Sequence, residues 1–212
     1  CEVGFRRDAI RVVHPGLSRA PVFADASSVD RGTFIYVGRL AASKRVDDVI
    51  RALAILRRSG RDARLVIIGQ GARVTAERLK RIALTEEVAE CVRFRGFVAT
   101  EERDRLLASA TAVVMASVRE GWGMSVTEAN AVGTPSVVYD RPGLRDSTVH
   151  GQTGLVTSPD PVSLATAMAQ LMDDAPLRER LAVGARSWAQ QLTWEATTDA
   201  VEDGLRQVTM PG

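Results

Sequence analysis

The feature that most constrains the fold is the alternation of short apolar runs with amphipathic segments along the chain. Short apolar runs bounded by turn residues predict strands, and apolar residues three or four positions apart predict helices. The runs at 65–68 and 112–115 are apolar at every position, which is typical of parallel strands covered on both faces. Strands are predicted at 11–13, 33–37, 64–68, 91–94, 112–116, 136–139 and 154–156.

Helical patterns fill the intervals between these strands. The clearest pattern has acidic residues near its start and two arginines near its end, as the helix dipole favours, and its apolar positions are Val46, Val49, Ile50 and Leu53. Weaker helices are predicted after residues 71 and 100 and over 125–132. The tail over 161–208 is predicted to be helical, with breaks near Pro176 and Thr193.

This alternation predicts an α/β fold: a Rossmann-like, doubly wound parallel sheet with helices on both faces and a helical tail over about 161–212. We expect residues 1–212 to form one domain, with its weakest joint at 18–32. With 45% hydrophobic and 25% charged residues among 212, the composition is that of an ordinary globular protein. A chain of this length buries a sizeable core without disulfides or metals.

Charge and residue usage exclude several classes of function. A net charge of +2 is too small for bulk attraction to a polyanion, and scattered basic residues with 5% aromatic residues argue against nucleic-acid binding. His14 and His150 have no partner at metal-ligand spacing, so no metal site is expected. Cys1 and Cys91 suggest no disulfide framework. The chain has no apolar stretch long enough to span a bilayer and no signal-peptide pattern, so a cytoplasmic location is expected.

The loop after the predicted strand 112–116 carries the strongest candidate site. Two glycines flank an aromatic residue, and a helix begins directly afterwards, so the loop offers close backbone approach and free N–H groups to an anion. Glu120 precedes this helix and Glu128 lies inside it, where each carboxylate could accept bonds from sugar or ribose hydroxyls. The alternative is that both are exposed acids and that Trp122 only packs.

Three further loops follow predicted strands, at the edge where open α/β sheets bind ligands. Gly38, Arg39 and Lys44 follow strand 33–37 and suit a diphosphate, although solvated surface cations are an alternative. The run at 69–71 is interpreted as a tight turn, because the third glycine of a dinucleotide motif is missing. The loop at 140–146 either reaches a ligand or is simply a turn.

Taken in order, these loops resemble the C-terminal domain of retaining glycosyltransferases of family 4, which have the GT-B fold. The resemblance covers nearly the whole chain, and the two glutamates seven residues apart within ordered flanking motifs make it specific. The matching motifs are Gly38-Arg39-Leu40 with Lys44, Gly69-x-Gly71, Val92-x-Phe94-x-Gly96, Glu120-Gly121-Trp122-Gly123-Met124 with Glu128-Ala129, Gly133-x-Pro135, Gly151-x-x-Gly154-Leu155-Val156, and Trp194-Glu195.

The resemblance implies transfer of a hexose from a nucleotide-diphosphate sugar, UDP- or GDP-linked, with retention and without a cofactor or essential metal. Arg39 and Lys44 would bind the diphosphate and stabilise the leaving nucleotide, Glu120 would contact the hexose, and Glu128 would hold the ribose. The donor would also be bound by Gly38 and by the main chain of Gly121, Trp122, Gly123, Met124 and Ser125, with Phe97 and Val98 near the base.

The same resemblance implies that an N-terminal acceptor domain is missing, and the opening without Met also suggests a fragment. We therefore expect the chain alone to bind donor and to be inactive in transfer. Peripheral membrane association of a full-length enzyme and self-association of the fragment are further partner expectations.

Three departures and two alternative functions stay open. Trp122 replaces a more common Phe, Pro142-Gly143 replaces a Gly-Gly pair, and Asp146 replaces Glu, which leaves the contribution of the 140–146 loop in doubt. The alternatives are a nucleotide-sugar epimerase of GT-B architecture and a noncatalytic nucleotide-binding module.

Overall fold

The computed structural model describes residues 10–17 and 30–209, and its centre is a six-stranded parallel sheet. The strands lie in the order β3-β2-β1-β4-β5-β6, and every neighbouring pair is parallel. The predicted doubly wound α/β fold is therefore confirmed. The strands are β1 Asp30–Val37, β2 Arg64–Ile68, β3 Val92–Gly96, β4 Ala110–Met115, β5 Ser136–Tyr139 and β6 Gly154–Thr157.

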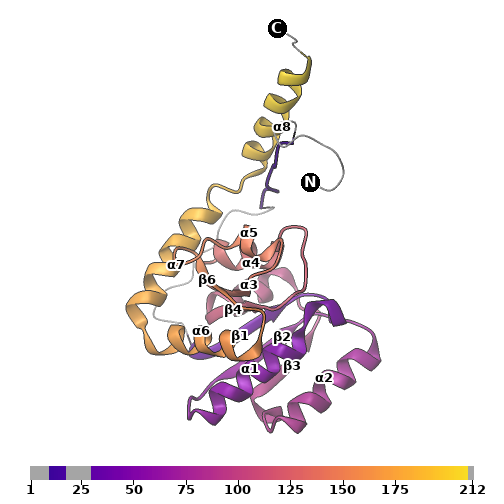
Figure 1. Ribbon diagram of the computed structural model, residues 1–212, viewed down its shortest axis with the longest axis vertical. Coiled ribbons are helices and arrows are strands. Elements are labelled where there is room, and N and C mark those ends of the chain that lie inside the picture. Colours follow the sequence, from indigo (N-terminus) through magenta and orange to yellow (C-terminus); the bar gives the residue numbers. More distant parts are fainter. Residues whose placement is uncertain (1–9, 18–29, 210–212) are drawn as a thin grey trace.

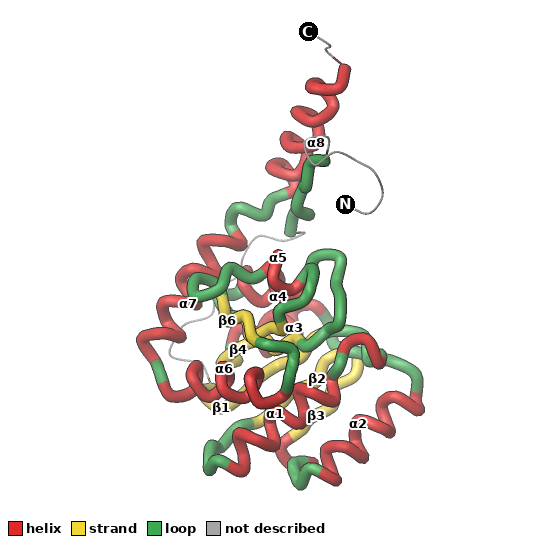
Figure 2. Tube along the Cα trace, viewed as in Figure 1, coloured by secondary structure: helices red, strands yellow, loops and turns green. Residues whose placement is uncertain are grey.

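Helices cover both faces of this sheet (Figure 2). Helix α1 packs against α2 and α6, whereas α4 packs against α3, α5 and α7, so the helices form two layers. The bounds are α1 Val46–Arg58, α2 Arg73–Thr85, α3 Thr100–Ala108, α4 Met124–Ala131, α5 Leu144–Ser147, α6 Pro161–Asp173, α7 Ala175–Ala189 and α8 Trp194–Thr209, with short 3₁₀ turns at η3 Ala42–Lys44 and η4 Ala89–Cys91.

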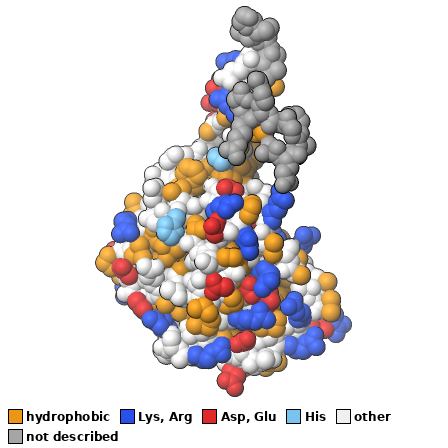
Figure 3. All heavy atoms as spheres, in the orientation of Figure 1, with side chains coloured by type: hydrophobic (Ala, Val, Ile, Leu, Met, Phe, Trp, Pro, Cys, Tyr) orange, Lys and Arg blue, Asp and Glu red, His pale blue; other side chains and the backbone are white. Residues whose placement is uncertain are grey.

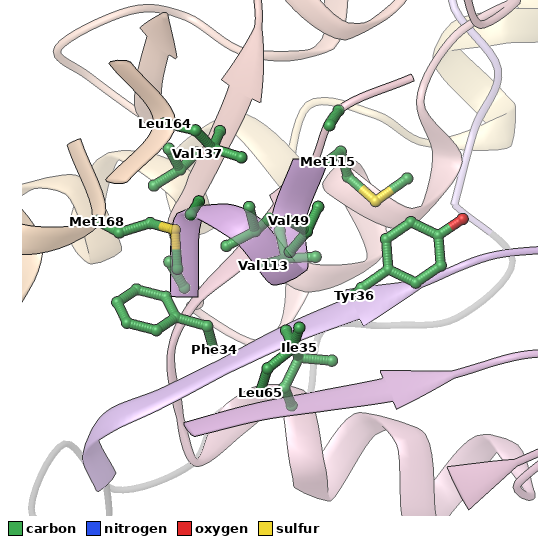
Figure 4. Close-up of a cluster of buried hydrophobic side chains, with 14 of the residues drawn as sticks. Phe34, Ile35, Tyr36, Val49, Leu65, Val113, Met115, Val137, Leu164 and Met168 are labelled. Atoms are coloured by element: carbon green, nitrogen blue, oxygen red, sulfur yellow. The ribbon is translucent and has the colours of Figure 1, made fainter. Parts of the chain in front are cut away.

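The core lies between the sheet and these helices. Phe34, Ile35 and Tyr36 of β1 are fully buried and alternate between its two faces. Figure 4 shows them beside side chains from α1, β4 and α6, among them Val49, Val113 and Met168. This burial fixes β1 and β4 as the centre of the sheet.

Some predicted boundaries were wrong. Residues 11–13 form no strand, because this segment lies beside α8 rather than the sheet: the carbonyl of His14 accepts a bond from Thr197 Oγ1 (2.8 Å), and Leu17 N–H donates to the Leu192 carbonyl (2.8 Å). The break predicted near Pro176 falls at Asp174, since proline is tolerated in the first turn of a helix. Helix α5 replaces part of the predicted loop at 140–146. Of the predicted joint at 18–32, residues 18–29 lie outside the described residues.

Helix α8 extends away from the α/β body, with residues 10–17 alongside it (Figure 1). In the described ranges, no helix is both long enough and apolar enough to cross a bilayer.

Candidate functional site

The candidate site lies where the chain leaves β1 and β4 at the carboxyl edge of the sheet. Strands β1 and β4 are neighbours in the sheet. Strand β2, which follows β1 in the chain, lies on one side of this pair, and β5, which follows β4, lies on the other. This edge of the sheet is therefore a topological switch point. The two loops also contact each other, because Val118 N–H donates to the Ser43 carbonyl (2.9 Å). Residues far apart in the sequence therefore lie together at this edge of the sheet.

Lys44 and Glu120 form a direct ion pair at this edge of the sheet. Lys44 Nζ lies 2.6 Å from each carboxylate oxygen of Glu120, and Ser117 Oγ donates to Oε1 at 2.6 Å. The two side chains are only 18% and 16% exposed, so their attraction is screened less than that of a surface pair. The structure brings together the two residues that sequence motifs assigned separately to the diphosphate and the hexose.

Arg39 lies in the same β1–α1 connection, with its side chain exposed. Among the described residues, nothing pairs with its guanidinium, but its carbonyl accepts a bond from Tyr36 Oη (3.0 Å). Burial raises the pKa of the Tyr36 hydroxyl, and the negative charge of Glu120 raises it further. Tyr36 is therefore a neutral donor at physiological pH, and it fixes the backbone between Gly38 and Lys44.

The loop after β5 supports the backbone of Glu120. Glu120 N–H donates to the Pro142 carbonyl (3.0 Å), and Gly143 is held at φ 81° by Asp146, whose Oδ2 accepts from Gly143 N–H (2.7 Å). A Cβ at Gly143 would lie 2.3 Å from the Glu120 carbonyl oxygen, so only glycine permits this approach. The 140–146 loop, whose role was left open, braces the Glu120 backbone.

Helix α4 begins beside this cluster. Gly123, at φ 72°, is its N-cap and provides no side-chain cap, so the N–H groups of Met124 and Ser125 are oriented as in anion-binding helix termini. Gly121 and Met124 are exposed. The backbone predicted to bind phosphate therefore lies at an accessible helix N-terminus next to Lys44.

Glu128 lies one turn further along α4 and has a different partner. Its Oε1 is 3.2 Å from Arg103 Nη1 on α3, and burial raises the pKa of Glu128, whereas the charge of Arg103 lowers it. The two predicted carboxylates thus do not contact each other, and each pairs with its own cation. The pairing with Arg103 was not predicted.

Trp122 and the predicted base loop are the remaining site residues. The Trp122 ring lies 4.2 Å, centroid to centroid, from the His14 ring, and its Nε1 is buried without a hydrogen-bond partner among the described residues. Phe97, after β3, is 80% exposed, and Val98 is half-buried. Trp122 therefore contacts His14 within the candidate loop, and its role in donor binding stays a prediction.

The charge of the site is local. On the face shown in Figure 3, basic and acidic side chains are interspersed rather than segregated. Within residues 10–17 and 30–209, no group of three or more His, Cys, Asp or Glu side chains could hold a metal ion.

Comparison with known proteins assigns the family. The profile described as "Glycosyl transferases group 1" matches residues 22–188. The chain belongs to this family. Among curated members, a D-inositol 3-phosphate glycosyltransferase from Corynebacterium diphtheriae is 35% identical over 79% of this chain and 40% of that protein. A glycogen synthase from Mycobacterium tuberculosis is 32% identical over 98% of this chain and 52% of that protein.

The chain thus spans about half the length of these two group 1 relatives. Among solved structures, HepE from Anabaena in complex with UDP superposes with a TM-score of 0.85 at 20% identity, covering 97% of this chain and 60% of that one. At this identity the likeness bears on the fold alone, and it agrees with the expected half of a GT-B architecture.

Several residues at the candidate site were not predicted from the sequence. No role was predicted for Ser117, although its position directly after a strand was an available signal. Arg103 and His14 carried no local signal, because each contacts a residue brought close only by the fold, and Tyr36 was expected only as part of a strand.

Proposed function

We propose that this chain binds a nucleotide-diphosphate sugar at the carboxyl edge of its sheet, as the donor-binding part of a retaining glycosyltransferase that moves a hexose to an acceptor without a metal. The observation that carries the proposal is the half-buried Lys44–Glu120 pair at the switch point, next to the open N-terminus of α4. UDP is our first choice of nucleotide, because related folds were solved with UDP and with UDP-glucose.

The geometry supports the task that we propose for each residue in this reaction. The Lys44 ammonium has three N–H donors, and two of them can bond to Glu120, which leaves one for a phosphate oxygen. Arg39, exposed in the same β1–α1 connection, would offer a planar fork to the same diphosphate. These cations and the N–H groups of α4 would stabilise the charge that develops on the leaving nucleotide, a task that otherwise requires a metal ion.

Glu120 would bind the hydroxyl groups of the donor sugar. Its carboxylate is held by Lys44 and Ser117, and its backbone is fixed by the β5–α5 loop, so little ordering is needed when hydroxyl groups replace water. Glu128 would accept bonds from the ribose hydroxyls, while Phe97 and Val98 would lie near the base.

Calorimetric titration with UDP, GDP, UDP-glucose and GDP-mannose, with EDTA present, tests the proposal. We expect saturable binding of one nucleotide class. K44A should weaken binding of the diphosphate by about tenfold to a hundredfold, because a charge-assisted hydrogen bond contributes about 1.5 to 3 kcal/mol.

The matched control is K80A, which removes the other lysine of the chain from the exposed surface of α2. Binding by no nucleotide, or equal affinities for K44A and K80A, would refute the assignment of the diphosphate site. E120Q should weaken binding of UDP-glucose more than binding of UDP, since only the sugar nucleotide contacts this carboxylate.

A further inference from the structure

The ion pair between α3 and α4 leaves part of Glu128 available. Arg103 Nη1 lies 3.2 Å from Oε1, and among residues 10–17 and 30–209 no group hydrogen-bonds Oε2. The side chains are 22% and 27% exposed, so the pair is neither a solvated surface contact nor closed off from a ligand. One oxygen is held by the protein and the other can bind a hydroxyl group.

The guanidinium is itself fixed in orientation. Arg103 Nε and Nη2 lie 3.1 and 3.0 Å from Asp104 Oδ1, which engages one side of the planar fork and turns Nη1 towards Glu128. A guanidinium held on two sides loses less freedom for each bond formed than a flexible ammonium does. Asp104 and Arg103 together therefore act as a rigid support for one carboxylate.

The charges around Glu128 explain why its carboxylate needs a cationic partner. Burial raises the pKa of Glu128, and the nearby carboxylate of Asp104 raises it further, whereas Arg103 lowers it by its charge and its hydrogen bond. An ionised carboxylate only accepts hydrogen bonds, whereas in a protonated carboxyl group one oxygen carries a proton and donates. Without the guanidinium, Glu128 would become a poorer acceptor at a given pH.

The pair also joins two parts of the candidate site. Helix α3 begins two residues after Val98, in the loop expected to approach the base, and α4 begins at Met124, in the loop expected to approach the phosphates. A nucleoside bound by both loops would have its ribose next to the contact between these helices.

We propose that Arg103 is a positioning residue of the nucleoside site, which holds one oxygen of Glu128 so that the other receives the ribose hydroxyls. This inference rests on the proposed function, in which Glu128 binds the ribose.

The first experiment compares UDP with 2′-deoxy-UDP and 3′-deoxy-UDP, or the guanosine series if GDP is the nucleotide that binds. In the unmodified chain, we expect loss of a ribose hydroxyl to weaken binding by about tenfold. R103M, which keeps the length of the side chain without its charge, should reduce this discrimination to about the level of E128Q. Affinity for the deoxynucleotides should change little.

R105M is the matched control, because Arg105 lies on the same helix, is exposed and bonds to the Glu101 carbonyl. It should leave the discrimination intact. R103K, which keeps a positive charge at this position, should retain part of the ribose discrimination. Thermal unfolding of each variant separates these effects from loss of the fold.

A second experiment needs no ligand. NMR titration of the Glu128 side-chain carboxyl should give a higher pKa in R103M than in the unmodified chain, and R105M should give no change. An unchanged Glu128 pKa in folded R103M, or full ribose discrimination by that variant, would overturn the inference.

The ribose role of Glu128 and the positioning role of Arg103 can be refuted separately. If E128Q leaves ribose discrimination unchanged, the ribose role of Glu128 is wrong, and the inference falls with it. If E128Q abolishes discrimination while R103M preserves it, the proposed function stands and only the role of Arg103 is wrong. Absence of binding by every nucleotide would overturn both.

Discussion

Glu120 is held by contacts from three connections of the fold. Lys44 comes from the connection after β1, Ser117 from the end of β4, and Pro142 and Gly143 from the loop after β5. These contacts involve both its side chain and its backbone. A change at any of these positions should therefore affect ligand binding through Glu120, even where the altered residue touches no ligand.

Gly143 provides the sharpest test of this arrangement. G143A would place a Cβ 2.3 Å from the Glu120 carbonyl oxygen, whereas G60A, at a similar φ of 84°, would meet nothing within 4 Å. We expect G60A to lower the free energy of unfolding by roughly 1 to 2 kcal/mol from backbone strain alone. G143A should cost more than this and should also weaken binding of UDP-glucose.

Urea denaturation and calorimetric titration measure the two effects. Equal losses of stability in G143A and G60A, with unchanged binding in both, would show that the β5–α5 loop does not brace Glu120.

At the residue scale, the sequence predicted which side chains lie at the carboxyl edge but not how they pair. Arg39, Lys44 and Glu120 were accessible to prediction because each follows a recognisable strand. The contact between Lys44 and Glu120 spans 76 positions and depends on the adjacency of β1 and β4, which no local pattern encodes. The pairing of Arg103 with Glu128 was missed for the same reason.

At the element scale, helices α6 and α7 have clear start signals. Asp160 and Asp174 are their N-caps: each accepts a bond from a backbone N–H three residues later (2.8 Å in both), and each helix has a proline in its first turn. The end of α6 and the start of α7 share Asp174, which explains why the break falls there rather than at Pro176.

Removing the cap of α7 should destabilise the fold. We expect D174A to lower the free energy of unfolding by about 1 kcal/mol, because the N–H of Leu177 loses its acceptor. D174N keeps an acceptor oxygen and serves as the control. Urea denaturation would contradict the assignment if both variants were equally stable.

The elements that could be predicted are those whose own residues determine them. Strands 64–68 and 136–139 were predicted to the residue, because their apolar runs are sharply bounded. The valines at 12 and 13 also favour extended backbone, yet they form no strand, since the partner of this segment is helix α8. Helix α5, with four residues, is too short to show a period.

At the scale of the whole molecule, the chain spans about half the length of the two curated relatives. Helix α8 extends from the body with Trp194, Val201 and Leu205 at least 46% exposed. Apolar side chains on a projecting helix are typical of a surface that packs against another part of a protein.

We therefore expect this chain alone to bind donor and to transfer sugar weakly or not at all, because acceptor positioning contributes a large share of the rate. Release of UDP from UDP-glucose, measured with and without a panel of polyol and glucan acceptors, checks this expectation. The rate of UDP release by E120Q gives the background. Acceptor-dependent turnover well above that background would show that the described fold is sufficient for catalysis.

The stacking of His14 on Trp122 has an optical consequence. The indole belongs to the loop between β4 and α4, and the imidazole belongs to a segment anchored on α8. Emission from an indole changes with the polarity of its surroundings and with the groups that touch its ring. Trp122 shares the emission of the chain with Trp188 and Trp194, so a variant that keeps only Trp122 would report movement between that loop and the projecting helix.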